Sequence, residues 1–213
     1  MTGKVKNQLN ELGKIVNQVS NLINNGKPFG NTERQTLFLA YFDIDVEHVQ
    51  SLHLLISNDN IGSASALVRT FYETFFRALW VNAFATTEQL EEIRNNKFEF
   101  KNMGSKILQL DSHYTGTEFF KNLKNRVWGT MSDYTHSGSY QLSRRWTDGK
   151  LVPNYKENEI LEIIIEVTKA YLLFANMLFQ IHGYDKEKDT ILDILIKYKK
   201  EIEPILNTIY PSA

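Results

Sequence analysis

The segment from Ala64 to Phe84 constrains the fold most, because as a helix it is apolar around almost its whole circumference. A helix that is apolar on all faces is typical of the buried centre of a helical bundle. We therefore expect this helix to contact most of the others. Its buried positions should include Leu67, Phe71, Phe75, Leu79 and Val81.

The pattern of apolar residues in the rest of the chain predicts amphipathic helices separated by turns, without the alternation typical of a strand. The loop expected at 147–155 precedes the last two helices. Helices are predicted over residues 3–25, 32–57, 63–84, 87–96, 117 to the break at 136–138, 156–182 and 186–207. Residues 97–115 are less clear, although Ile107 and Leu108 indicate a short helix. The sequence thus predicts an all-α, single-domain bundle of five to seven helices.

Three helix ends carry local signals. Thr32 and Gln35 have the spacing of a capping box at the start of the second helix. Ser63 is the expected N-cap of the apolar third helix, and Gly183 is the expected residue just after the helix that ends near His182.

The amino-acid composition excludes several kinds of functional site. The chain has 213 residues, a net charge of −1 and no cysteine, which excludes disulfides, thiolate metal sites and cysteine nucleophiles. The N-terminal residues lack the apolar run of a signal peptide. The most apolar segment, 160–181, contains Glu162, Glu166 and Lys169, which are costly inside a membrane. We expect a cytoplasmic protein that does not enter a membrane.

Residues 1–30 are predicted to form an N-terminal amphipathic helix, and residues 31–213 the bundle domain. The first helix repeats apolar residues at alternating spacings of four and three, at Val5, Leu9, Leu12, Val16, Val19 and Ile23. Such a heptad-like seam either lies on the chain's own core or forms a dimer or partner interface. The sequence leaves both alternatives open.

Arg69, Glu73 and Arg77 stand four residues apart on the third helix, so their side chains form a ladder on one face. One interpretation is a narrow solvent-exposed stripe of ion pairs. The other is a polar seam that faces another polar element, for which the segment 132–146 is the obvious candidate.

The segment 132–146 is dense in reactive side chains. We expect His136 to transfer protons, with Asp133 or Tyr134 orienting its ring, and Arg144 to hold a phosphate. Further candidate ligand-binding residues are Arg145, Tyr140, Tyr134 and Arg77. These are the parts of a phosphodiester site that needs neither a metal nor another cofactor. The alternative is a helix C-cap followed by a solvated arginine pair.

The second helix also carries two histidines and several acids, but their spacing disfavours a metal site. His48 and His53 are five residues apart, about 140° around a helix, so they do not converge on one ion. We expect His48 to hydrogen-bond within the bundle or to face solvent.

The segments 65–73, 133–138 and 141–145 together resemble a group of uncharacterised bacterial proteins that are distantly similar to the HEPN superfamily. The resemblance implies a helical bundle, usually dimeric, in phage defence or toxin-type systems. Active members are RNases with the site at the dimer interface. Their signature has four to six residues between an arginine and the histidine that follows it, whereas nine residues separate Arg126 from His136 here. Arg144 or Arg69 would have to take that place.

From these features we expect an RNase or RNA-binding protein, with His136 as acid/base, Arg144 and Arg69 as phosphate contacts, and Glu73 fixing Arg69. The expected partners are a second copy of the chain, RNA and a partner protein. The alternative is a non-catalytic helical interaction protein whose polar seam is structural or binds a small anion. The sequence does not decide whether the protein is an enzyme.

Overall fold

The computed structural model describes residues 1–24, 30–136 and 138–210. Its α-helices are α1 (Gly3–Asn24), α2 (Glu33–Ser57), α3 (Ile61–Phe84), α4 (Thr87–Arg94), α5 (Met103–Leu110), α6 (Phe119–Thr135), α7 (Ser139–Ser143), α8 (Glu157–Ile181) and α9 (Asp185–Ile209). A π-helical turn, η1 (Asp111–Thr115), follows α5, and the strands β1 (Trp146–Thr147) and β2 (Lys150–Leu151) form an antiparallel hairpin. The all-α class is confirmed.

The described residues form nine α-helices and one π-helical turn, more than the five to seven helices predicted. The excess comes from short elements such as the five-residue α7, which lies within the segment expected to carry the site. The β1–β2 hairpin lies where a plain loop was expected. Each of its strands is two residues long, too short to leave an alternating pattern in the sequence.

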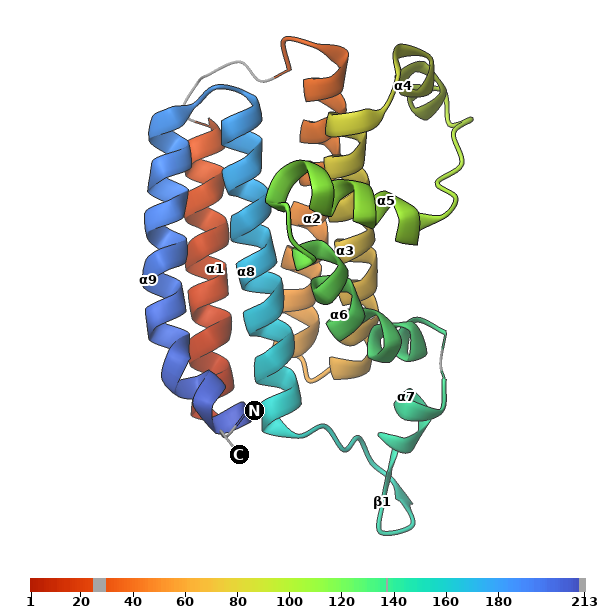
Figure 1. Cartoon of the computed structure of the whole chain (residues 1–213). Coiled ribbons are helices and arrows are strands. Elements are labelled where there is room, and N and C mark those ends of the chain that lie inside the picture. Colours follow the sequence, from red (N-terminus) through yellow and green to blue (C-terminus); the bar gives the residue numbers. More distant parts are fainter. Residues whose placement is uncertain (25–29, 137, 211–213) are drawn as a thin grey trace.

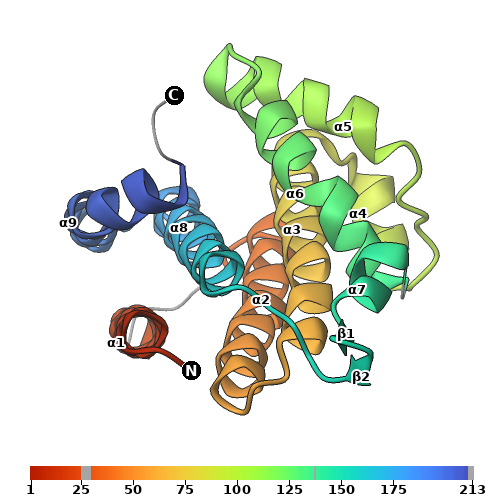
Figure 2. The same cartoon turned by 90° about the horizontal axis from the view of Figure 1, so that it is seen from below.

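The helices are arranged in three groups (Figures 1 and 2). On one side, α8 packs against both α1 and α9. The hairpin of α2 and α3 occupies the middle, where both helices contact α8. On the other side, α5 and α6 lie against α3. This order places α3 between the long helices and the shorter ones, with α6 covering the face that bears the polar ladder.

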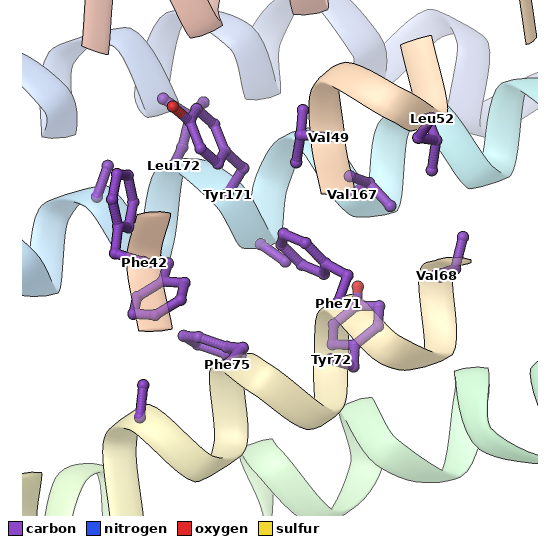
Figure 3. Close-up of a cluster of buried hydrophobic side chains, with 14 of the residues drawn as sticks. Phe42, Val49, Leu52, Val68, Phe71, Tyr72, Phe75, Val167, Tyr171 and Leu172 are labelled. Carbon is purple, nitrogen blue, oxygen red and sulfur yellow. The ribbon is translucent and has the colours of Figure 1, made fainter. Parts of the chain in front are cut away.

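Helix α3 is the buried centre that its composition predicts, and it packs against α2, α5, α6 and α8. Of the five residues expected inside, Leu67 is half-buried and the others are fully buried. Figure 3 shows the side chains of Phe71 and Phe75 meeting those of α2 and α8. The ring centroid of Phe75 lies 5.1 Å from that of Phe174, which is also 5.1 Å from Phe42. This aromatic cluster joins the three helices.

The seam of α1 faces the chain's own core. Val5, Leu9 and Leu12 are at most 2% exposed, and α1 packs mainly against α8 and α2. The Tyr198 hydroxyl of α9 donates a hydrogen bond to Gln8 of α1 over 3.0 Å. The heptad-like seam of α1 therefore packs on the chain's own core, which is the first of the two predicted alternatives. The predicted boundary near residue 30 falls beside residues 25–29, outside the described residues.

The capping signals give two confirmed predictions and one wrong one. Thr32 and Gln35 form the predicted capping box of α2, and Gly183 follows α8 with a φ of 73°. Ser63 is not the N-cap of α3, because this helix already begins at Ile61. Asn60 holds the N-cap position without a side-chain hydrogen bond.

Among the helices that the structure describes, none has the combination of length and apolar character required to cross a bilayer.

Candidate functional site

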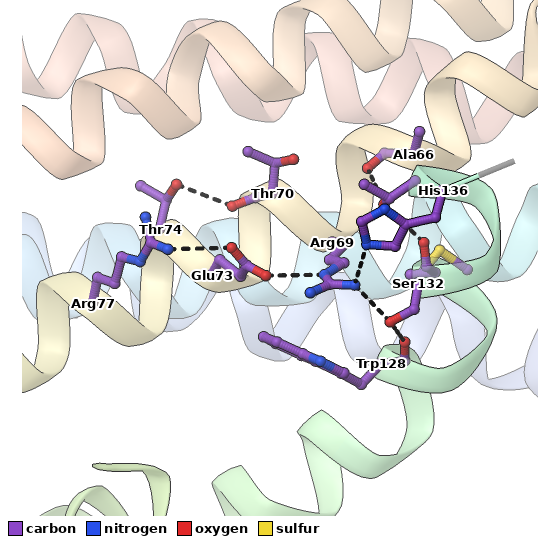
Figure 4. A network of polar contacts seen from close by, with 11 residues as sticks. Ala66, Arg69, Thr70, Glu73, Thr74, Arg77, Trp128, Ser132 and His136 are labelled. Atoms are coloured by element: carbon purple, nitrogen blue, oxygen red, sulfur yellow. Dashed lines mark hydrogen bonds and ion pairs between the residues drawn. The ribbon is translucent and has the colours of Figure 1, made fainter. Parts of the chain in front are cut away.

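The ladder on α3 is a continuous set of ion pairs (Figure 4). The Nε of Arg69 donates to one carboxylate oxygen of Glu73 over 2.9 Å, and the Nη2 of Arg77 donates to the other over 3.4 Å. The side chains of Arg69 and Glu73 are 21% and 23% exposed, so the ladder is neither fully buried nor an open surface stripe. Glu73 thereby fixes both guanidinium groups.

Helix α6 supplies the second half of the site. Trp128, Ser132 and His136 are four residues apart, which brings them to one face of α6 and its C-cap. The Nη1 of Arg69 donates to the Ser132 hydroxyl over 2.8 Å and contacts the His136 Nε2 at 3.3 Å. The guanidinium carbon of Arg69 lies 5.1 Å from the centroid of the Trp128 ring. Arg69 is therefore held at four points: by a carboxylate, a hydroxyl, an imidazole and an indole face.

The contact with Arg69 indicates which ring nitrogen of His136 accepts a hydrogen bond. An arginine N–H can only donate, so the His136 Nε2 is the acceptor in this contact, a role that requires the tautomer with its proton on Nδ1. His136 is the C-cap of α6 and its side chain is exposed. The predicted end of the helix near His136 and Gly138 is thus confirmed, while Ser137 lies outside the described residues.

Asp133 does not orient the imidazole through any contact that the described residues make. Its carboxylate instead accepts the backbone N–H of Tyr140 over 2.7 Å and so caps the start of α7. A Cβ at Gly138 would lie 2.3 Å from Asp133 Oδ1, so the chain can pass over this carboxylate only with glycine at that position. This packing fixes how α7 turns away from α6.

Arg144 belongs to a different set of contacts. It forms an ion pair with Glu159 of α8, and its Nη2 also donates to the Tyr140 hydroxyl over 2.7 Å. Its guanidinium carbon lies 4.8 Å from the Tyr140 ring centroid. The hydrogen bond to Tyr140, together with the charge of Glu159, raises the pKa of Arg144 against a smaller opposing effect of burial. We call Tyr140, Arg144 and Glu159 the α7 cluster.

Two other predicted residues lie beside the α7 cluster. Tyr134 packs edge-on against Tyr140 with ring centroids 5.6 Å apart, and burial is the main cause that raises its pKa to about 12. Arg145 covers the start of α3: its Nη2 lies 3.0 Å from where a Cβ on Gly62 would be. The structure therefore brings Arg69, Glu73, Arg77 and His136 together, and gives Arg144, Arg145, Tyr140 and Tyr134 other contacts.

Trp128 and Ser132 were not among the predicted site residues. The signal for them was present, because Trp128, Ser132 and His136 share the four-residue spacing that singled out the ladder on α3. What the spacing does not reveal is that this face of α6 meets Arg69. That contact depends on how two helices 60 residues apart in the chain pack together.

A buried polar pair on α2 was also missed. Asp45 is 0% exposed, and its Oδ1 lies 3.1 Å from the Nδ1 of His48. Burial raises the pKa of Asp45 well above its ordinary value, opposed by a hydrogen bond with Thr74, and burial lowers the pKa of His48. Both shifts favour the neutral form of the group concerned. His48 thus hydrogen-bonds within the bundle, one of the two predicted alternatives.

Within the described ranges, no group of three or more histidine, aspartate or glutamate side chains has an arrangement that could hold a metal ion.

Comparison with known proteins gives one match. No curated protein and no solved structure matches the chain. Residues 42–204 match a family described as a family of unknown function (DUF6988). The matched range runs from within α2 to within α9 and includes both the Arg69 site and the α7 cluster. The chain therefore belongs to the DUF6988 family.

Proposed function

We propose that this protein is a HEPN-like, metal-independent endoribonuclease that binds single-stranded RNA across α3 and α6. The observation that carries the proposal is the contact between Arg69 and His136. It pairs a fixed phosphate-binding group with an exposed group that can accept a proton. Arg69 lies within α3 and His136 directly follows the last residue of α6, and helices position a site more precisely than loops do.

The surroundings of Arg69 suit a nucleic acid. Trp128 is half-buried, and base stacking on an aromatic ring contributes about 1–3 kcal/mol per base. Lys124 lies 5.4 Å from the same ring, and Arg77 lies 5.1 Å from the centroid of Phe100. Three cations thus accompany two aromatic rings along the ladder of α3 and the facing side of α6, a combination that single-stranded nucleic-acid sites use.

The chemistry follows from the hydrogen bonds of Arg69. When a phosphate oxygen takes the Nη1 hydrogen bond of Arg69, the His136 Nε2 is released to act as a base. It then accepts the proton of the ribose 2′-hydroxyl while the 2′-oxygen attacks phosphorus. The bond from phosphorus to the 5′-oxygen breaks, the departing oxygen takes a proton from water, and a 2′,3′-cyclic phosphate remains. Arg69 stabilises the charge that develops on the phosphate oxygens.

This assignment modifies the one made from the sequence. Arg69 is the phosphate contact and Glu73 a positioning residue, whereas Arg144 is held by Glu159. The proposal includes a homodimer, a partner protein and a role in a bacterial defence or toxin-type system. Because the α1 seam is used inside the chain, the dimer would form through another surface.

One observation favours the alternative, a non-catalytic interaction protein. Both oxygens of Glu73 and two of the donor nitrogens of Arg69 already have protein partners, as in a network that serves packing alone. In that case the same residues would join α3 to α6, or hold a small anion.

RNA binding tests the two alternatives. We expect the wild type to bind a fluorescent single-stranded RNA, measured by anisotropy, with an affinity that falls as salt rises. Arg69→Ala should reduce the slope of log K against log salt by about 0.7, because one phosphate contact on a single strand is lost. Arg94→Ala is the matched control, since Arg94 is an exposed arginine whose side chain is 63% accessible. Equal slopes for wild type and Arg69→Ala would favour the structural alternative.

A further inference from the structure

A hollow lies between α3, α6 and α8, and its lining includes Met131 and Tyr134 of α6 but neither Trp128 nor His136. Its apolar floor consists of Val68 of α3, Met131 of α6 and Ile163 of α8, and its volume is about 100 Å³. Pockets for drug-sized ligands measure roughly 300–1,000 Å³, so this one suits a much smaller molecule or a single side chain.

The wall on α8 is acidic. Glu159, Glu162 and Glu166 are spaced by three and four residues and line the hollow together, with Arg126 as the cation among the lining residues. Glu159 is paired with Arg144, and Glu166 is paired with Lys169 over 2.6 Å and with Arg126 over 3.5 Å. Glu162 has no cation within ion-pair distance in the described parts of the chain; its carboxylate accepts the hydroxyl of Tyr210.

Tyr134 of α6 brings a hydroxyl group without a hydrogen-bond partner among the described residues to the same hollow. Tyr134 lines the hollow and is 5% exposed, and its hydroxyl makes no hydrogen bond with any described residue. Tyr140 also lines the hollow, with its ring edge-on to that of Tyr134 and its hydroxyl donating to Glu159 over 3.2 Å.

We propose that this hollow binds a primary ammonium or guanidinium group on a short aliphatic stem. The cationic head would pair with Glu162 and donate a hydrogen bond to the hydroxyl oxygen of Tyr134, while the stem lies on Val68, Met131 and Ile163. The pKa of an ordinary tyrosine, about 10, already keeps the hydroxyl protonated at neutral pH, and burial raises the pKa of Tyr134 further, so it presents a neutral oxygen to the cation. An aromatic wall adds a cation–π attraction.

The same head group occurs in free aliphatic amines and in the lysine or arginine side chain of a polypeptide. Titration calorimetry with the full chain separates these sources. The probes are butylamine and putrescine for free amines, Nα-acetyl-lysine amide and Nα-acetyl-arginine amide for side chains, and 1-butanol as a neutral analogue. Saturable binding of the amines alone would identify a free amine as the ligand, and tighter binding of the amides would identify a polypeptide side chain.

Two variants test the assigned contacts. Glu162→Gln keeps the shape of the side chain but removes its charge, and should weaken binding of the best probe about tenfold or more, since a charged hydrogen bond is lost. Tyr134→Phe should weaken it less and leave the ring in place. Glu203→Gln, a change at an exposed glutamate of α9, should leave binding unchanged. Circular dichroism melting establishes that each variant is folded.

The proposal is overturned if no probe binds at millimolar concentration, if 1-butanol binds as well as butylamine, or if Glu162→Gln binds like the wild type.

Discussion

Gly62 and Gly129 allow one substitution to be made in two contrasting helical environments. A Cβ at Gly62, in the first turn of α3, would lie 2.6 Å from the Tyr155 hydroxyl and 3.0 Å from Arg145 Nη2. At Gly129, inside α6, nothing stands within 4 Å of the new Cβ. The pair therefore tests whether the segment after α7 packs onto the start of α3.

The expected effects have opposite signs. Gly129→Ala should stabilise the fold by about 0.5–1 kcal/mol, because alanine loses less backbone entropy in a helix. Gly62→Ala gains at most the same backbone-entropy stabilisation. Its new methyl group also crowds Tyr155 and Arg145, and such overpacking costs about 1–3 kcal/mol. Its net effect should be a loss of about 0.5–2 kcal/mol. For a chain of this size, 1 kcal/mol shifts the melting temperature by about 2–4 °C.

Thermal melting by circular dichroism measures both variants against the wild type. We expect the melting temperature to rise by a few degrees for Gly129→Ala and to fall for Gly62→Ala. If Gly62→Ala stabilises the protein as much as Gly129→Ala, then Tyr155 and Arg145 do not cover α3, and the described position of the segment after α7 is wrong.

Two further predictions concern the core. Phe75→Ala should lower the free energy of unfolding, measured by urea titration, by about 3–5 kcal/mol. Phe119→Ala, at an exposed position, should lower it far less. Equal losses of unfolding free energy in the two variants would contradict the central place of α3. Burial raises the pKa of Asp45 above its unfolded value, so its contribution to stability is complete below the unfolded pKa and is lost as pH rises through the folded pKa. The Asp45→Asn variant has no carboxyl group to ionise at this position and so escapes the loss of stability. The difference between its melting temperature and that of the wild type should therefore increase with pH. A difference that does not change with pH would refute the raised pKa of Asp45.

Local features were the ones that the sequence allowed us to predict. The apolar circumference of 64–84 identified the central helix, and the four-residue spacing of Arg69, Glu73 and Arg77 identified their ion pairs. Both depend only on helical geometry, which acts over a few residues. The same holds for the capping box at Thr32.

Partners distant in the sequence could not be predicted in this way. Nothing near Arg144 indicates that it pairs with Glu159, because this contact depends on how α7 packs against α8. For His136, the sequence suggested Arg69 and Arg144 alike, and only the packing of α6 on α3 distinguishes them. Side-chain spacing reveals which face of a helix is polar, whereas the packing of helices determines what that face meets.

The most direct test of the proposed function is cleavage of single-stranded RNA by the purified full chain in the presence of a chelator. We expect products with 2′,3′-cyclic phosphate ends and no cleavage of DNA of the same sequence, which lacks the attacking hydroxyl. His136→Ala should reduce the rate about 10²–10⁴-fold, the usual contribution of a general base, while its melting temperature stays close to that of the wild type. His113→Ala, at an exposed histidine of η1, should cleave like the wild type. An inactive wild type, or a His136→Ala variant that cleaves at the wild-type rate, would contradict the proposed function.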